Sequence, residues 1–207
     1  MDWTDEGIVL SARKHGETSA IVTLLTRNHG RHLGLVRGGK GKRARGILQP
    51  GNLIQARWQA RLVEHLGYYN CELNEGFAAK FMRNALKLSA LSSACALAEG
   101  ALAEREAHRP VFDGLLALLY SFERGDWPSA YVKWELGFLG EVGFGLDLTA
   151  CAKTGQTDQL AYVSPKSGRA VSLAAGAPYK NKLLILPQFL LHPGEGGTAK
   201  EINEGLK

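Results

Sequence analysis

The sequence has 207 residues, of which 45% are hydrophobic and 22% are charged. This composition is typical of a globular protein and excludes disordered, collagen-like and mucin-like chains. No apolar stretch approaches the roughly 20 residues of a membrane-spanning helix, and the acidic start Met1–Glu6 is unlike a secretory signal. We therefore expect a cytoplasmic protein, without a membrane partner, of one large domain or two small ones.

The positive charge is concentrated in the first third of the chain. Residues 1–70 hold 11 lysines and arginines against 5 acidic residues, whereas residues 71–207 hold 14 against 15. Clustered cations repel one another unless a polyanion neutralises them, so this bias predicts nucleic-acid binding. An acidic membrane surface or an acidic protein partner is the alternative. The candidate DNA-binding cations are Arg27, Arg31, Arg37, Lys40, Lys42, Arg43, Arg45, Arg57 and Arg61.

Five short strands are predicted in the same segment, because apolar and polar residues alternate between turns rich in Gly, Asn and Pro. Their expected ranges are Gly7–Arg13, Ser19–Thr26, Arg31–Arg37, Asn52–Arg61 and Tyr68–Leu73. Five such strands suggest a small barrel. In the fourth strand Ile54 and Trp58 fall on one face, while Arg57 and Arg61 fall on the other. We therefore expect Trp58 in the core, and Tyr68 is the aromatic candidate for base stacking.

A run of glycines and cations over residues 37–46 separates the third and fourth strands. We expect it to be a flexible loop that faces water or a phosphate group. Gly34–Lys40 also matches the first seven positions of the phosphate-binding loop G-x-x-x-x-G-K-[ST]. Gly41 replaces the hydroxyl residue of that motif, and residues 42–46 are not expected to begin a helix. A nucleotide-dependent enzyme is therefore only an alternative function.

The periodicity becomes helical after residue 76. We expect helices over residues 77–108, 110–123 and 126–142, packed as a bundle. Lys80, Arg83 and Lys87 line one side of the first helix and are weak candidates for binding an acidic partner. A looser region over residues 146–176 precedes the apolar segment 183–191. A last helix is expected to begin at Thr198 and stops short at the final residue, as if the chain were truncated.

The sequence contains no recognisable catalytic or metal-binding pattern. Cys71, Cys95 and Cys151 are far apart and form no C-x-x-C pair, so we expect reduced thiols. The 6 histidines show no HExxH spacing, and no G-x-S-x-G is present. These patterns favour a binding protein without a cofactor over an enzyme. A scaffold that binds no DNA is a further alternative.

Several short motifs follow one another along the chain in a characteristic order. They are Gly7–Leu10, Gly16–Glu17, Leu24–Thr26, Gly30, the basic run at 37–46, Leu48–Pro50, Leu146–Asp147, Cys151, Thr154–Gly155, Tyr162–Gly168, Gly176–Tyr179 and Leu184–Leu190. Together they resemble the RecO family of bacterial recombination mediators, in particular its alphaproteobacterial branch. The resemblance covers about residues 7–207.

The resemblance implies an α+β fold with three parts. These are a five-stranded OB-fold barrel over residues 1–75, a helical domain over 76–145, and a small zinc-ribbon-like segment over 146–207 that returns to the helical domain. It also implies binding of single- and double-stranded DNA and annealing of complementary strands without a nucleotide. With the partner RecR, such a protein would help to load RecA on DNA coated with single-stranded-DNA-binding protein. The acidic tail of that protein would dock on the helical domain, and the location would be the cytoplasm, with the nucleoid.

The zinc site that the resemblance implies is degenerate in this sequence. Where many family members carry four cysteines, this chain has Cys151, Thr154, Ser172 and Ala175. Structural zinc is almost always held by four strong ligands in a tetrahedron, and only one thiol is left here. We therefore expect hydrogen bonds and packing, rather than a metal, to hold this segment together.

Overall fold

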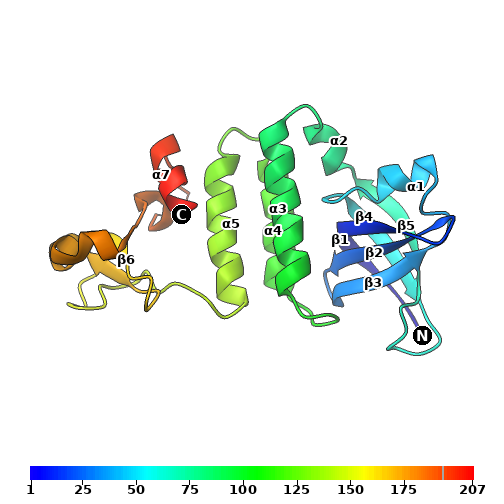
Figure 1. Cartoon of the computed structure of the whole chain (residues 1–207), viewed down its shortest axis with the longest axis horizontal. Coiled ribbons are helices and arrows are strands. Elements are labelled where there is room, and N and C mark those ends of the chain that lie inside the picture. The colour runs from blue at the N-terminus through cyan, green and yellow to red at the C-terminus, as the bar shows by residue number, and fades with distance from the viewer. Residues whose placement is uncertain (193) are drawn as a thin grey trace. The chain divides into compact units, whose positions relative to one another are not determined.

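The computed structural model describes residues 1–192 and 194–207. They form two compact units, residues 1–120 and 121–207. Strands β1 to β5 and helix α1 belong to the first unit, and β6 and α7 belong to the second (Figure 1). Both strands and helices are present in each unit. The mixed α+β class predicted from the sequence is therefore confirmed.

The first five strands close into a barrel. They are β1 (Asp2–His15), β2 (Ser19–Thr26), β3 (Gly30–Val36), β4 (Leu53–Gln59) and β5 (Tyr68–Glu75). Their order around the barrel is β1-β2-β3-β5-β4, and β4 returns to pair with β1. Neighbouring strands are antiparallel, except that β3 and β5 meet in parallel at Leu35 and Tyr68. All five predicted strands are present, and β1 begins earlier than predicted, at Asp2.

One long strand closes the barrel by pairing on both sides. The first half of β1 pairs with β4, and the second half pairs with β2. Gly7 and Ile8 pair with both neighbours, and the register with β2 shifts just after them, between Val9 and Ser11. A bulge of this kind bends a strand and increases its twist. The bend is stabilised from outside the ladder, because the amide of Gly51 donates a hydrogen bond to the carbonyl of Val9 at 2.7 Å.

The barrel core follows the alternation of the strands. Its buried side chains include Val9, Val22, Leu24, Ile54 and Trp58. Trp58 is 2% exposed, and its indole N–H donates to the carbonyl of Leu66 at 3.0 Å, so its only polar atom is satisfied. The prediction that Trp58 belongs to the core is confirmed.

The basic run after β3 is not a flexible loop throughout. Residues 38–41 form a turn, and helix α1 (Lys42–Ile47) follows directly. Ala44 and Ile47 of this helix pack against the barrel core, and Leu48, which follows, is part of that core. The prediction that residues 42–46 do not begin a helix is therefore wrong. Apolar residues spaced through the basic run hold α1 on the barrel and leave its charged side chains in solvent.

Three helices follow the barrel. They are α2 (Phe77–Phe81), α3 (Ala85–Ala101) and α4 (Arg109–Ser121). The prediction of a single helix over residues 77–108 is wrong, because the helix is interrupted at residues 82–84 and α3 ends at Ala101. Asn84 caps the new helix by accepting a hydrogen bond from the amide of Lys87 at 3.1 Å.

Helix α3 is attached to the barrel by apolar contacts and by one carboxylate. Leu91, Ala94, Cys95 and Ala98 are its buried residues. The Glu99 carboxylate accepts hydrogen bonds from the Ser11 hydroxyl at 2.6 Å and the Thr23 hydroxyl at 3.1 Å. These two hydroxyls lie on β1 and β2, so Glu99 joins α3 to both strands. The helix thus belongs structurally with the barrel.

The second unit contains a helix, a small sheet and a short terminal helix. Its elements are α5 (Trp127–Glu141), β6 (Leu160–Val163), β7 (Ala170–Ser172), α6 (Leu173–Gly176), η1 (Ala177–Lys182), β8 (Leu184–Ile185), η2 (Gln188–Leu190) and α7 (Ala199–Gly205). The strand order is β7-β6-β8. At α7, Thr198 accepts a hydrogen bond from the amide of Glu201, whose carboxylate in turn accepts one from the amide of Thr198. The predicted start of the last helix is confirmed.

Candidate nucleic-acid interface

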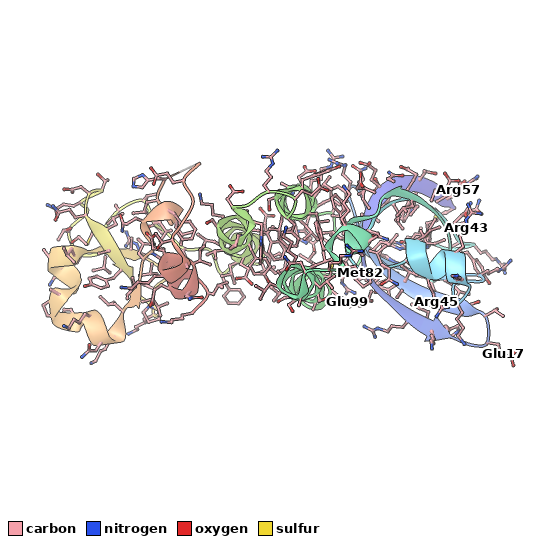
Figure 2. All side chains as sticks on the ribbon, turned by 90° about the horizontal axis from the view of Figure 1, so that it is seen from above. Glu17, Arg43, Arg45, Arg57, Met82 and Glu99 are labelled. Carbon is pink, nitrogen blue, oxygen red and sulfur yellow. The ribbon has the colours of Figure 1, made fainter. Side chains whose placement is uncertain are left out.

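Three predicted DNA-binding cations lie on α1 and are exposed to solvent. They are Lys42, Arg43 and Arg45. No carboxylate among residues 1–192 and 194–207 forms an ion pair with any of them. Figure 2 shows Arg43 and Arg45 projecting from this short helix. Their charge is therefore not neutralised within the described chain and is available to an external anion.

Three further candidates lie outside α1 and also form no ion pair within the described residues. The guanidinium of Arg37 lies over the ring of Tyr68, 4.2 Å from its centroid. The ammonium of Lys40 donates to the carbonyl of Gly16 at 2.6 Å and so ties the turn after β3 to the turn after β1. Arg61 is exposed just after β4. No carboxylate in the described part of the chain offsets the charge of any of the three.

The other three candidates have partners inside the first unit. Arg27 forms ion pairs with Asp113 at 2.6 Å and Glu6 at 3.3 Å. Arg57 pairs with Asp2 at 2.9 Å and thereby holds the pKa of that carboxyl below its ordinary value. The Nε of Arg31 donates to the carbonyl of Leu102 at 2.8 Å. Arg27, Arg31 and Arg57 are thus held by partners within the first unit. The other six candidates form no ion pair in the described residues.

A hollow of about 720 Å³ lies beside the unpaired cations. It is lined by the end of β3, by α1 and by the start of β5, including Arg37, Lys42, Arg43 and Tyr68. Cys71 also lines it, and burial raises the pKa of this thiol to about 12. The thiol is therefore neutral at physiological pH. The charged groups around the hollow are all positive, which suits an anionic ligand.

Sequence reasoning missed one cation of this surface. Lys14, near the end of β1, lines a smaller hollow of about 210 Å³ together with Lys40 and Arg45. The signal was present in the strand pattern, because Lys14 follows Ala12 on the same face of β1. It adds a further cation to the surface formed by the turn after β3 and by α1.

Residues 34–40 match the sequence of a phosphate-binding loop but do not form one. Gly34 lies inside β3, and a Cβ atom there would be 2.3 Å from the ring of Tyr69. Gly39 packs equally closely, since a Cβ atom there would be 2.7 Å from the Cβ of Ala20. These glycines make room for neighbouring side chains of the barrel. The motif is a packing requirement rather than a cradle for phosphates.

The three cations considered for an acidic partner do not share one helix. Lys80 belongs to α2 and Lys87 to α3, while Arg83 lies in the break between them. Lys80 forms an ion pair with Glu75 at 3.0 Å. The ammonium of Lys87 lies 5.8 Å from the ring centroid of Phe81. The prediction that the three line one side of a continuous helix is wrong, and their partner role stays a prediction.

The four positions compared with a zinc site do not fit that metal. The amide of Ser172 donates to the Cys151 sulfur at 3.2 Å, and hydrogen bonds from Ser172 and Thr154 lower the pKa of the Cys151 thiol to about 6. Ala175 has no donor atom, and the two hydroxyls are weak ligands beside a single thiol. No group of three or more His, Cys, Asp or Glu side chains in the described residues is arranged to hold a metal ion.

Within the described residues, no helix combines the length and the apolar character needed to span a membrane.

Comparison with known proteins covers almost the entire chain. A family model described as the N-terminal domain of recombination protein O matches residues 1–77, and a model of its C-terminal domain matches residues 82–204. The chain belongs to the RecO family. The N-terminal RecO model ends at Phe77, where α2 begins, and the C-terminal model starts at Met82, directly after α2.

Individual RecO proteins are also similar to this chain over most of their length. A protein of Rhodospirillum centenum named DNA repair protein RecO is 56% identical over 208 residues, which cover 100% of this chain and 83% of the relative. A protein of the same name from Rhodospirillum rubrum is 50% identical, with 100% and 85% covered. Another from Methylobacterium nodulans is 49% identical, with 96% and 80% covered.

Proposed function

We propose that this chain is a DNA-binding recombination mediator in DNA repair, acting without a nucleotide. Membership in the RecO family supports the repair role. The observation that carries DNA binding is the set of unpaired cations on α1 and on the turn before it, beside the hollow at Arg37 and Tyr68. The barrel on which they sit is an OB fold, a fold that commonly binds oligonucleotides.

The cations act on DNA by neutralising its phosphates. Each Lys or Arg that contacts a phosphate releases condensed counterions, and this term is independent of base sequence. Two complementary strands repel each other in solution, and a surface carrying Lys42, Arg43 and Arg45 reduces that repulsion. Annealing then proceeds by base pairing alone. Binding of double-stranded DNA follows from the same phosphate contacts.

The role in the cell requires protein partners. RecR and the acidic tail of single-stranded-DNA-binding protein are the partners that family membership suggests, with loading of RecA as the outcome. The docking site of the tail is proposed on the helices that follow the barrel, where Lys80, Arg83 and Lys87 are candidates. The protein would act in the cytoplasm at the nucleoid. We propose that residues 146–207 form the degenerate zinc-ribbon-like segment, held by the apolar core around Cys151.

The test of DNA binding is a salt titration of the full chain. We expect a fluorescently labelled single strand to bind with a log–log salt slope that falls by about 2 when Lys42, Arg43 and Arg45 are all changed to Ala, because each contact contributes about 0.7. Fluorescence anisotropy at about 50 to 200 mM salt measures this slope. The loss of affinity should be the same for strands of different sequence.

A matched variant controls for the change in net charge. Lys166, Lys180 and Lys182 are exposed cations of the second unit, without ion pairs in the described residues, and changing all three to Ala removes the same charge. We expect this variant to keep the original slope. Equal slopes for both triple variants and the unchanged chain would remove α1 from the proposed interface.

A further inference from the structure

Tyr68 occupies an unusual position on the outside of the barrel. It begins β5 at the seam where β3 and β5 meet in parallel, with Leu35 as its partner on β3 and Gln59 on β4. The next residue, Tyr69, points into the barrel and is 5% exposed, whereas Tyr68 is 44% exposed. An aromatic ring in this place contributes little to the core. Its packing therefore does not explain why an aromatic residue stands there.

Two hollows meet at Tyr68. The larger, of about 720 Å³, contains Arg37, Lys42 and Arg43. The other, of about 400 Å³, is lined by Gln59 and Arg61, and by Met1 and Asp2. The carboxylate of Asp2 is already paired with Arg57 at 2.9 Å. Tyr68 thus stands as a ridge between two hollows with cationic linings, the larger of which has a size typical of small-molecule sites.

One neighbour of the ring is itself a stacking group. The guanidinium of Arg37 lies 4.2 Å from the centroid of the Tyr68 ring. A planar guanidinium can stack on an aromatic face on one side and on a nucleobase on the other. The pair therefore offers flat surfaces toward the hollows, close to cations that contact phosphates.

We propose that the Tyr68–Arg37 pair stacks an unpaired nucleobase and so adds, for single-stranded DNA, a contact that duplex DNA cannot make. The inference rests on the proposed DNA binding and adds to it a site for bases. In a duplex the faces of each base are covered by its neighbours, so only a strand with splayed bases can use the ridge. Lys42 and Arg43 on one side, and Arg61 on the other, contact the phosphates that flank the stacked base.

The direct test compares a normal single strand with an abasic strand of the same length, both bound to the full chain. The abasic strand keeps its phosphates and lacks the bases. We expect the normal strand to bind about fivefold to a hundredfold more tightly, the range of one stacked base. In the Tyr68→Ala variant this ratio falls toward one while the salt slope stays unchanged. Tyr68→Phe keeps the ratio, because it keeps the ring.

The second unit offers a matched control. Tyr179 is 53% exposed, and the ammonium of Lys153 lies 5.9 Å from its ring centroid. We expect Tyr179→Ala to leave the ratio of the two affinities as it is in the unchanged chain. A second measurement needs no variant: a strand carrying 5-iodouracil, irradiated on the unchanged chain, should cross-link to the peptide that contains Tyr68.

The outcomes separate this inference from the proposed function. Equal affinity for normal and abasic strands overturns the stacking site and leaves phosphate binding intact. Cross-linking only to peptides that lack Tyr68 overturns it as well. If neither strand binds at low salt, the proposed DNA binding fails, and the stacking site fails with it.

Discussion

At the scale of single residues, neighbouring tyrosines on β5 have opposite roles because a strand alternates its faces. Tyr69 is buried, with its hydroxyl 3.0 Å from Nδ1 of His32, while Tyr68 faces solvent. This alternation is readable in the sequence, as is the burial of Trp58. The partner of Arg27 is not, because Asp113 lies far along the chain and meets it only once α4 has packed.

His32 makes stability depend on pH. Burial is the main cause that lowers its pKa to about 4, and the charge of Arg105 acts in the same direction. The unfolded chain takes up this proton near pH 6.5, so it binds more protons than the folded chain between about pH 6.5 and 4. We expect the free energy of unfolding to fall as the pH is lowered through this window. Urea unfolding at several pH values measures the effect.

A substitution isolates the contribution of His32. His32→Gln removes the titrating ring, so its free energy of unfolding should fall less steeply between about pH 6.5 and 4. His65→Gln changes an exposed histidine of the loop before β5 and serves as the control. The explanation fails if the His32 variant keeps the full pH dependence of the unchanged chain.

At the scale of elements, helices differ in how much their own sequence reveals. The start of α7 is visible because Thr198 and Glu201 form a capping box. Helix α1 has no side-chain cap and contains no fully buried residue, so local signals for it are absent. It forms because Ala44 and Ile47 pack on a barrel that exists only in the folded chain. Tertiary packing here overrides a weak local preference.

The attachment of α3 to the barrel depends on Glu99. Its side chain accepts hydrogen bonds from Ser11 and Thr23 and pairs with the exposed Arg13 at 2.9 Å. Glu99→Ala should lower the free energy of unfolding by about 1–3 kcal/mol, mainly because the two hydroxyls lose their acceptor. Denaturant unfolding measures it. Glu17→Ala, at an exposed turn (Figure 2), is the control and should change stability by less than about 0.5 kcal/mol.

A comparable loss in both glutamate variants would show that Glu99 contributes no more than a surface charge. Exposed ion pairs are worth little, so the bond to Arg13 alone would not distinguish the two positions.

At the scale of the whole molecule, the charge is distributed by unit. The excess of cations predicted from residues 1–70 falls on the barrel and α1, where seven of the nine candidates are without a carboxylate partner in the described chain. Counting residues was enough to locate this surface. It was not enough to separate the cations of α1 from Arg27, Arg31 and Arg57, because ion pairs and hydrogen bonds between distant segments decide that division.

The second unit should be stable without a metal. Its core consists of apolar side chains around Cys151, including Leu160, Val163 and Leu186. Prolonged treatment with a chelator should therefore leave the Tm unchanged in differential scanning calorimetry, relative to a mock-treated sample. A fall in Tm that added zinc restores would contradict the conclusion drawn from the four positions.

The placement of Met1 has a practical consequence for anyone who labels or purifies this protein. Its amino group donates to the carbonyl of Ala60 at 2.8 Å, and Met1 itself lines the smaller hollow at Tyr68. An affinity handle fused ahead of Met1 would start at the rim of that hollow and obstruct it. Binding assays should therefore use a chain that carries no handle ahead of Met1.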